Sequence, residues 1–541
     1  MVTVSLNRNT LERLVGEELS QAQLKELLPR AKCAVEDVNE REVLCEITGD
    51  RPDLLCVEGA ARALKGVMKK ELGLPQLKVA PAKTFIKVHE NVAAVRPFIF
   101  SAYIEGVKVA GDEIAELMQI QEKLHLTHGR RRRKVAIGIH DAAKVAAPFS
   151  YKAVKGNEIS FVPLGKEEEM TFKEILEKHE KGKDYAFVFE GKDRYPAVLD
   201  AKGRVVSFPP IINAAMTTVT ESTKTFFLDI TGTDFDACNA TANIICQNYA
   251  DRGAKITAVE IQYPDKKISS PVSEPELMTI GAGEANKLIG TALKPAQLAE
   301  ALKRQRIGAR VEGDFIACEI PRYRTDFLHP IDLVEEIALG IGYNELGTKE
   351  PSMFTKGSRT RLNIDVDRVR DAMVGAGFME VATSVLSGDA VRKAQSPEKP
   401  LRIRNPVSNE YEFVRNSLVP GVLELLSKNT RRPYPQRVFE VGEVVERKAG
   451  AETRTTTRIS LCAAAAHKDA SLSEIASVLS DVMGGVELKK LSSKQFIPGR
   501  CASVAAKGKH SGTVGELSPE VLEAFGLELP VSVFEVAIGE I

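Results

Sequence analysis

The sequence predicts an α+β fold divided into several domains. The chain has 541 residues, which is too long for one hydrophobic core and suggests three or four domains. Residues 2–6 and 43–47 alternate in the manner of half-buried strands, whereas apolar residues in 54–68 recur at helical spacing. With 43% apolar and 27% charged residues, the chain can bury several cores and keep a charged surface.

Composition excludes several classes of protein. Lys and Arg total 74, as do Asp and Glu, so any binding of nucleic acid must come from local basic patches. The eight cysteines form no C-x-x-C pair, which argues against a zinc ribbon and a disulfide framework and favours a reducing compartment. Because we find no signal peptide and no apolar run of about 20 residues, we expect a cytoplasmic protein without a membrane span.

Changes in pattern along the chain predict four domains. Two helices around 285–289 and 296–304 precede two strands, an order typical of a winged-helix-like module. A linker-like stretch, LGLPQLKVAPAK, separates the beginning of the chain from a long mixed region. The predicted domains are 1–74, 75–266, 267–346 and 347–541.

The most distinctive segment is PRYRTDFLHPIDLVEEIALGIGYN, residues 321–344, because it concentrates four acids. Proline restricts the residue before it, so we expect a helix to begin at Ile331 or Asp332. Asp332, Glu335 and Glu336 would then share one helical face, and Asp326 could fold back toward them. Such oxygen ligands favour Mg²⁺. The same spacing is also a capping-box pattern, so a structural role stays open.

Three further segments carry polar groups whose roles the pattern leaves open. In the first, Asp53 is expected to cap the helix that follows a turn at 49–52. In the second, five consecutive cations at 130–134 could meet a phosphate backbone or form a solvated turn. The third segment, 205–238, places hydroxyls, an amide and carboxylates beside strand ends, which suits either a polar pocket or well-capped turns.

Near the start of the C-terminal region, apolar residues step by 4, 3, 4 and 3 along 362–376. This seam predicts a helix that packs either against another domain or subunit or onto its own sheet. A strand is expected at 381–386, and a last strand at 531–536.

Several of these segments together resemble one family. YRTDFLHPIDLVEEIALGIGYN and EITGDRPDLLCVEG, with 404–447 and 496–526, are similar to the beta subunit of phenylalanyl-tRNA synthetase in its archaeal and eukaryotic form. The resemblance implies that Asp326, Asp332, Glu335 and Glu336 are Mg²⁺ ligands. It also implies that 75–266 is a domain that hydrolyses tRNA(Phe) mischarged with tyrosine.

By the same resemblance, Ser207, Asp229 and Thr231 line the editing pocket, with Asn213 and Glu221 as further candidates. An apolar pocket cannot strongly discriminate by one hydroxyl, so the pocket needs buried hydrogen-bonding groups. No Ser-His-Asp or Cys-His arrangement is visible in the sequence, which favours a bound water over a covalent intermediate.

For the C-terminal region the resemblance implies a class II synthetase-like antiparallel sheet that has lost its adenylation chemistry. The catalytic F-R-x-E pair is replaced by Arg437-Val438-Phe439-Glu440, and the glycine-rich segment is reduced to Pro498-Gly499-Arg500. Adenylation with ATP would then belong to a catalytic alpha subunit in an alpha2beta2 heterotetramer that binds tRNA(Phe). The alternatives are a free-standing aminoacyl-tRNA deacylase and a non-enzymatic RNA-binding scaffold.

Overall fold

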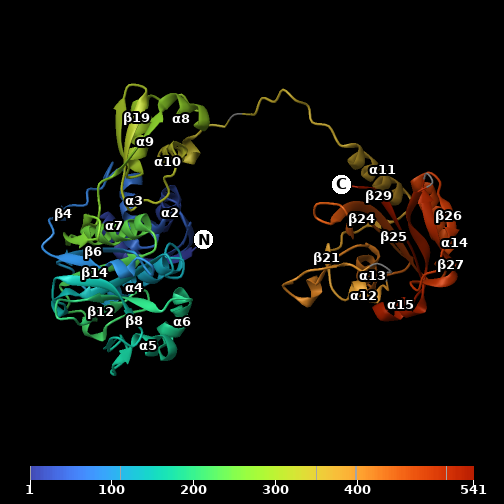
Figure 1. Cartoon of the computed structure of the whole chain (residues 1–541). Helices are drawn as coiled ribbons and strands as arrows, with labels where there is room; N and C mark the ends of the chain where they lie inside the picture. Colours follow the sequence, from blue (N-terminus) through green and yellow to red (C-terminus); the bar gives the residue numbers. More distant parts are fainter. Residues whose placement is uncertain (1, 110, 349, 396–398, 507–508, 541) are drawn as a thin grey trace. The chain divides into compact units, whose positions relative to one another are not determined.

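The computed structural model describes residues 2–109, 111–348, 350–395, 399–506 and 509–540. The chain forms two compact units, Met1–Glu350 and Pro351–Ile541 (Figure 1). Both contain sheets and helices, so the mixed α/β multidomain prediction is confirmed at that level. No helix among the described residues is long and apolar enough to cross a membrane.

The first unit begins with a three-stranded sheet in the order β1-β3-β2, covered by helices. Its elements are β1 (Val2–Asn7), α1 (Arg8–Val15), α2 (Gln21–Leu27), η1 (Pro29–Ala31), β2 (Cys33–Val38), β3 (Glu42–Ile47), η2 (Pro52–Leu54) and α3 (Val57–Val67). Leu11, Leu54 and Leu64 join one core with Phe100 and Ile230 from the following region, so this sheet does not pack in isolation.

The expected capping role of Asp53 is wrong. Helix α3 begins at Val57 with Cys56 before it, and no side chain caps it. Asp53 instead binds Arg51 through both carboxylate oxygens, each at 2.8 Å, and is buried. Because a buried carboxylate requires a charged or hydrogen-bonded partner, the neighbouring arginine determines where Asp53 points.

The middle of the first unit is an eleven-stranded sheet in the order β13-β12-β11-β8-β5-β15-β6-β14-β7, with β4 and β16 beside β15. Its strands are β4 (Val79–Ala80), β5 (Phe85–Val88), β6 (Phe98–Glu105), β7 (Val135–Asp141), β8 (Phe149–Lys155), β11 (Arg194–Leu199), β12 (Val205–Phe208), β13 (Ile212–Asn213), β14 (Thr225–Gly232), β15 (Lys255–Gln262) and β16 (Lys267–Ser270). The small pair β9 (Ser160–Phe161) and β10 (Met170–Thr171) lies outside it.

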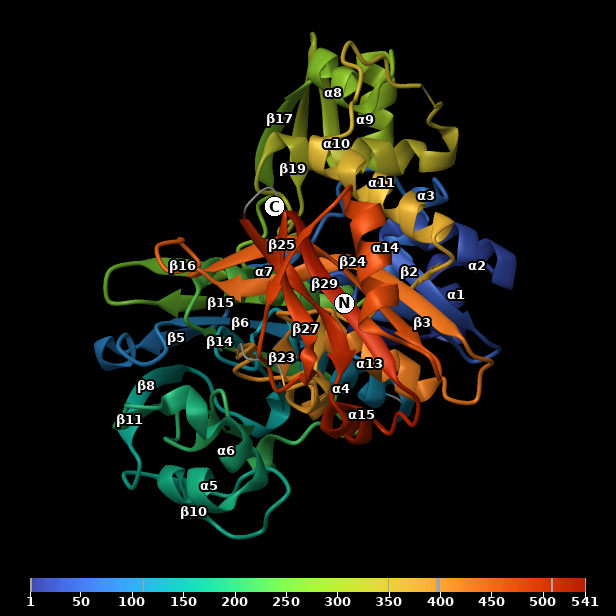
Figure 2. The same ribbon diagram turned by 90° about the vertical axis from the view of Figure 1, so that its right-hand side faces the viewer.

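The two ends of this sheet approach each other. Asn213 on β13 donates from Nδ2 to the Ile139 carbonyl on β7, at 3.3 Å. The longer helices of this region are α4 (Gly111–Leu126), α5 (Phe172–Lys178), α6 (Glu180–Tyr185) and α7 (Phe235–Asp251); its short turns are η3 (Glu90–Val92), η4 (Ala142–Lys144), η5 (Ala186–Phe189) and η6 (Ala215–Thr217). Helix α7 packs on β6 and β14, while α5 and α6 lie near β8 and β11 (Figure 2).

The first unit ends in a small module with its own core, built by three strands in the order β17-β19-β18 and three helices. The elements are β17 (Glu276–Gly281), α8 (Ala282–Ile289), α9 (Pro295–Arg304), β18 (Gly308–Glu312), β19 (Phe315–Ile320), α10 (Pro330–Ile341) and η7 (Tyr343–Glu345). Helix α10 begins at Pro330, earlier than expected, because proline at the first helical position lacks only an N–H that would be unpaired there.

The second unit has a seven-stranded sheet in the order β20-β24-β25-β29-β28-β27-β26 and a small sheet, β21-β23-β22. The strands are β20 (Met379–Glu380), β21 (Leu386–Ser387), β22 (Leu401–Arg402), β23 (Phe413–Val414), β24 (Gln436–Arg447), β25 (Thr455–Ala466), β26 (Glu487–Lys490), β27 (Phe496–Ala506), β28 (Lys509–Leu517) and β29 (Val531–Glu540). The helices are α11 (Arg361–Gly375), α12 (Ala390–Lys393), η8 (Asn409–Tyr411), α13 (Val419–Lys428), α14 (Leu472–Met483) and α15 (Pro519–Phe525).

Helices cover both faces of this large sheet. On β25, Leu461 and Ala463 face one core, whereas Cys462 and Ala464 face the other. Because successive strand residues point to opposite faces, the run LCAAAA can be buried throughout its length. Val369 and Met373 of α11 belong to the first core, so the 362–376 seam packs onto its own sheet.

The expected strand at 381–386 is wrong except at its last residue. Residues 381–385 form no strand, although β20 precedes them and β21 begins at Leu386. The Thr383 hydroxyl donates to Glu440 at 2.6 Å and accepts from Arg415 at 3.0 Å. These side-chain contacts attach the segment to β24 in place of further strand pairing.

Candidate functional site

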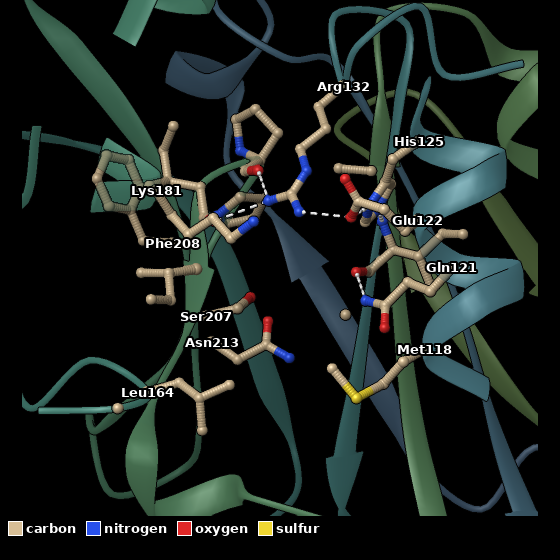
Figure 3. Close-up of a pocket in the computed structure, with 18 of the residues that line it drawn as sticks. Met118, Gln121, Glu122, His125, Arg132, Leu164, Lys181, Ser207, Phe208 and Asn213 are labelled. Carbon is tan, nitrogen blue, oxygen red and sulfur yellow. Dashed lines mark hydrogen bonds and ion pairs between the residues drawn. The ribbon is translucent and has the colours of Figure 1, made fainter. Parts of the chain in front are cut away.

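The candidate site is a cavity of about 820 Å³ in the middle of the first unit. Helix α4 and strand β7 form one wall, and the 207–213 segment with β12 and β13 forms the opposite wall (Figure 3). The cavity therefore lies where the two ends of the large sheet meet. This closure brings Ser207 and Asp229 together from strands that are far apart in the sheet order.

Asp229 is the polar centre of this cavity. Its side chain on β14 is buried, and its Oδ2 accepts a hydrogen bond from the Ser207 hydroxyl at 2.6 Å. The same oxygen lies 3.0 Å from Nε2 of His140, whose Nδ1 is 2.8 Å from the Thr217 hydroxyl. Both Ser207 and His140 therefore contact Asp229, which is not the order of a serine nucleophile activated by a histidine base.

Gly138 on β7 allows this group to approach the strand. A Cβ atom at Gly138 would lie 2.4 Å from Oδ1 of Asp229 and 2.8 Å from Nε2 of His140. Any larger residue would displace one of those two side chains. Only glycine at this position permits the present arrangement of Asp229 and His140.

The other predicted pocket residues lie in different environments. Asn213 lines the cavity, as do Ser207 and Asp229. Thr231 is fully buried, but it does not line the cavity; its hydroxyl and carbonyl accept from Arg96 at 2.9 and 2.6 Å. Glu221 is exposed on the segment before β14 and is also absent from the cavity wall.

Sequence reasoning missed the charged residues of the α4 wall. Glu122, His125 and Arg132 all line the cavity. Arg132 donates to the carbonyls of Pro210 and Ile211 at 3.1 and 2.9 Å and approaches Glu122 at 3.4 Å, so it ties the two walls together (Figure 3). The sequence signal was the adjacency of a charged helix and an arginine run, but neither indicated which side chains turn inward.

His125 is neutral at physiological pH, because burial lowers its pKa to about 4. Its Nε2 accepts a hydrogen bond from the Ile137 amide at 2.8 Å, so the proton of the neutral ring must be on Nδ1, which lies 3.8 Å from Glu122. The nearby His125 ring and Arg132 lower the pKa of Glu122 to about 2. Glu122 is therefore an ionised acceptor on the cavity wall.

The acids of the α10 region are arranged differently, because they surround positive side chains of the same chain. The Lys32 ammonium lies 3.1 Å from Glu335, 3.1 Å from Glu336 and 3.7 Å from Asp326. Burial lowers the pKa of Lys32, but Glu336 and Asp326 outweigh this effect and raise it. Lys32 thus stays protonated within the cluster.

Arg324 completes the pairing of two of these acids. It binds Asp326 through two hydrogen bonds of 2.8 and 2.6 Å and lies 2.9 Å from Glu336, which is almost fully buried. Burial alone would raise the pKa of Asp326, but the Arg324 pair lowers it below its usual range.

Asp332 caps the N-terminus of α10. Its Oδ2 accepts from the amides of Leu328 and His329 at 2.7 and 2.8 Å, which is the capping role left open by the sequence. Within the described ranges, no group of three or more His, Cys, Asp or Glu side chains is placed to hold a metal ion. In this arrangement the other acids bind the Lys32 ammonium and the Arg324 guanidinium, and they are not arranged as ligands of Mg²⁺.

In the second unit, Arg437 and Arg500 stand in the segments that resemble the ATP-binding motifs of catalytic synthetases, and both form ion pairs with acidic residues. Arg437 approaches Glu474 at 2.8 Å, and Arg500 approaches Glu516 at 2.8 Å. Glu440 is buried against Arg415 at 2.7 Å. The positive charges of Arg437 and Arg500 are therefore paired with carboxylates and are not available to bind phosphate groups.

Comparison with known proteins finds matches along the whole chain. Residues 348–538 match the family model described as "Phenylalanyl tRNA synthetase beta chain CLM domain", and residues 278–343 match the "tRNA synthetase B5 domain". The phenylalanine–tRNA ligase beta subunit of Archaeoglobus fulgidus is 40% identical, over 100% of this chain and 98% of its own length. The chain belongs to the phenylalanine–tRNA ligase beta subunit family.

Other members of this beta subunit family match over a similar extent. The beta subunit of Korarchaeum cryptofilum is 38% identical over 99% of this chain and 98% of its own. A solved N-terminal fragment of the phenylalanyl-tRNA synthetase beta subunit from Pyrococcus horikoshii has a TM-score of 0.61 and 35% identity. It covers 63% of this chain and is itself covered completely.

Proposed function

We propose that this chain acts as the beta subunit of an enzyme that attaches phenylalanine to tRNA(Phe) at the expense of ATP. The observation that carries the proposal is the match, along essentially the whole chain, to relatives named as phenylalanine–tRNA ligase beta subunits. Adenylation of phenylalanine and its transfer to tRNA would take place on a catalytic alpha subunit. The complex would be a cytoplasmic alpha2beta2 heterotetramer.

The second unit would be a class II synthetase-like scaffold that supports the alpha subunit. The acids paired with Arg437 and Arg500 support this role, because a phosphate clamp needs arginines that are available to an anion. The module formed by α8 to α10 and β17 to β19 would be a winged-helix-like part of the same subunit.

An amino-acid-dependent ATP–pyrophosphate exchange assay tests this assignment. The chain alone should give no exchange, and adding a partner alpha subunit should give robust exchange with phenylalanine. If the alpha subunit brings no gain, the chain is a free-standing deacylase or an RNA-binding scaffold instead.

The second proposed activity is hydrolysis of Tyr-tRNA(Phe) in the cavity around Asp229. Water would add to the carbonyl carbon of the ester that joins tyrosine to the terminal ribose. The ester C–O bond then breaks, which releases tyrosine and leaves the ribose hydroxyl on the tRNA. The cavity supports this proposal because it combines apolar wall with a few buried polar groups.

Selection of tyrosine over phenylalanine requires a partner for the phenolic hydroxyl. Sites built to hydrogen-bond a hydroxyl reject the analogue without it by about 10⁴–10⁵. The buried Asp229 carboxylate and the ionised Glu122 are the acceptors at hand, and Asn213 can donate or accept. Thr231, which accepts hydrogen bonds from Arg96, would lie behind the cavity wall rather than touch the substrate.

Ser207 is assigned to substrate positioning rather than to covalent attack. Its proton is donated to Asp229, and no histidine of the described chain bonds to its hydroxyl oxygen. A water held between the substrate and the cavity wall is therefore the proposed nucleophile.

The direct test is a deacylation assay with the full-length chain. Tyr-tRNA(Phe) should be hydrolysed, and Phe-tRNA(Phe) should survive under the same conditions. Similar hydrolysis of both would remove the proposed selection by the hydroxyl, and no hydrolysis of either would remove the editing function.

Magnesium binding by Asp326, Asp332, Glu335 and Glu336 is kept as a separate proposal. It would require the Lys32 ammonium to leave the acids that it now contacts and Asp332 to give up its cap. No step of the proposed reactions depends on this ion.

A further inference from the structure

The arginine-rich turn between α4 and β7, residues 129–134, has an unusual backbone. Arg130, Arg131 and Arg132 have φ values of 48°, 54° and 65°, so three consecutive non-glycine residues adopt the left-handed conformation. This conformation is unfavourable for residues with a Cβ atom, because the Cβ lies too close to the following carbonyl oxygen. Strain of this kind persists only where surrounding contacts impose it, and it clusters at functional sites.

The contacts that impose this shape come from the cavity wall. The Arg132 side chain points inward, where it donates to the 210 and 211 carbonyls and lies 4.2 Å from the centre of the Tyr185 ring. The Arg132 amide donates to the His125 carbonyl at 3.1 Å, and the Lys134 amide donates to the Gly129 carbonyl at 2.8 Å. The turn is thus anchored to the cavity through one arginine.

The remaining arginines of the turn point outward around an aromatic ring. Arg130, Arg131 and Arg133 are exposed. The guanidinium carbons of Arg131 and Arg133 lie 5.1 and 4.8 Å from the centre of the Phe187 ring, close enough for cation–π contact. Contact with one ring limits the freedom of both long side chains, so less entropy is lost when they bind an anion.

These side chains line a hollow of about 720 Å³ that we call the basic hollow; its lining residues are Arg130, Arg131, Arg133, Lys134, Phe187, Thr233 and Asp234. Lys134 is paired with Asp234 at 3.2 Å. Within the described part of the chain, no ion pair neutralises Arg130, Arg131 or Arg133. The protein as a whole is electrically neutral, so this positive charge is a local feature.

We propose that the basic hollow binds the phosphate backbone near the 3′ end of the tRNA and so directs the aminoacylated end into the cavity. This inference rests on the proposed editing function. Guanidinium groups bind phosphate oxygens in pairs, which suits a backbone rather than a base. Arg132 connects the two places, because it lines the cavity while its neighbours on either side line the hollow.

The test compares two substrates of the full-length chain that differ in phosphate. One is Tyr-tRNA(Phe), and the other is tyrosyl-adenosine, which carries the same ester but no phosphate. The variant is Arg130→Ala with Arg131→Ala, because neither side chain reaches the cavity. The control is Arg13→Ala with Arg310→Ala, which removes two exposed arginines elsewhere in the first unit.

For the hollow variant we expect KM for Tyr-tRNA(Phe) to rise 10- to 100-fold with kcat little changed. Hydrolysis of tyrosyl-adenosine should equal that of the wild type. The slope of log KM against log salt concentration should fall by about 0.7–0.9 for each phosphate group that the variant no longer binds. The control variant should match the wild type with both substrates.

Two results would overturn the inference. An unchanged KM for Tyr-tRNA(Phe) would show that the hollow does not bind the backbone. Equal losses with both substrates would show that the turn only supports the cavity wall. If the wild type hydrolyses neither substrate, the editing proposal fails by itself, and the affinity of the same variants for uncharged tRNA(Phe) decides on the hollow: unchanged affinity refutes it and weakened affinity supports it.

Discussion

The cavity around Asp229 and the acid cluster around Lys32 bury carboxylates to nearly the same depth. Asp229 is 2% exposed and Glu336 is 1% exposed. Asp229, however, contacts a serine hydroxyl and a histidine ring beside an open cavity, whereas Glu336 contacts an ammonium and a guanidinium. A buried carboxylate therefore marks a binding site only where its charge is not already satisfied by the same chain.

The largest expected effect concerns the acid cluster around Lys32, where the buried carboxylates are already paired with cations. Glu336→Gln should lower the free energy of unfolding of the first unit by about 3–5 kcal/mol, because it removes the most deeply buried of the negative charges that compensate Lys32 and Arg324. The matched control is Glu335→Gln on the same helix, where the side chain is half exposed and an effect below about 1 kcal/mol is expected. Denaturation followed by circular dichroism measures both. Equal, small effects would mean that the cluster is more solvated than described.

The next effect is a pH dependence of stability that arises from His125 in the wall of the cavity around Asp229. Because the pKa of His125 falls from 6.5 unfolded to about 4 folded, the folded state binds fewer protons between these values. Stability should therefore fall as pH decreases from 6.5 to 4, by about 3 kcal/mol at 1.36 kcal/mol per pKa unit. His125→Gln should show a flatter dependence over the same range. If both proteins lose stability in parallel, His125 does not cause the change.

A smaller effect is expected at the strand that faces Asp229. Gly138→Ala should destabilise the protein by about 1–3 kcal/mol, as overpacking does, and should slow hydrolysis of Tyr-tRNA(Phe). Gly283→Ala is a suitable control, since a Cβ there meets nothing within 4 Å and alanine favours helix α8. Melting temperature and deacylation rate are measured together. Full activity in Gly138→Ala would mean that Asp229 can move without loss.

The smallest effect tests whether the acid cluster binds Mg²⁺ once the Lys32 ammonium is removed. Mg²⁺ should stabilise the wild type less than a variant without the Lys32 ammonium, because Lys32 lies among the acids that would bind the ion. In Lys32→Met, Mg²⁺ at ten times its dissociation constant should restore about 1.4 kcal/mol. Thermal melts with and without Mg²⁺ measure this difference. Equal stabilisation of the wild type would show that the acids accept a metal ion despite Lys32.

The elements and the residue types of both regions could be predicted from the sequence, but the partners of those residues could not. Alternation correctly indicated β1 and β3, and helical spacing correctly indicated α9 and α10. Neither pattern shows that Lys32, about 300 residues before Glu336, lies beside it. Likewise, His140 and Arg132 enter the site only because the sheet closes and the left-handed turn directs Arg132 inward. Such contacts depend on tertiary structure, and local pattern carries no signal for them.

We place the hydrolysis of tyrosine from tRNA(Phe) in the cavity around Asp229. The most direct measurement is the single-turnover rate of Tyr-tRNA(Phe) hydrolysis by Asp229→Ala, in complex with the alpha subunit, beside the rate of Phe-tRNA(Phe) synthesis. We predict that hydrolysis slows by about 100-fold or more, in line with the loss of a positioned polar group, while synthesis stays largely intact. Hydrolysis at the wild-type rate would show that Asp229 takes no part in editing.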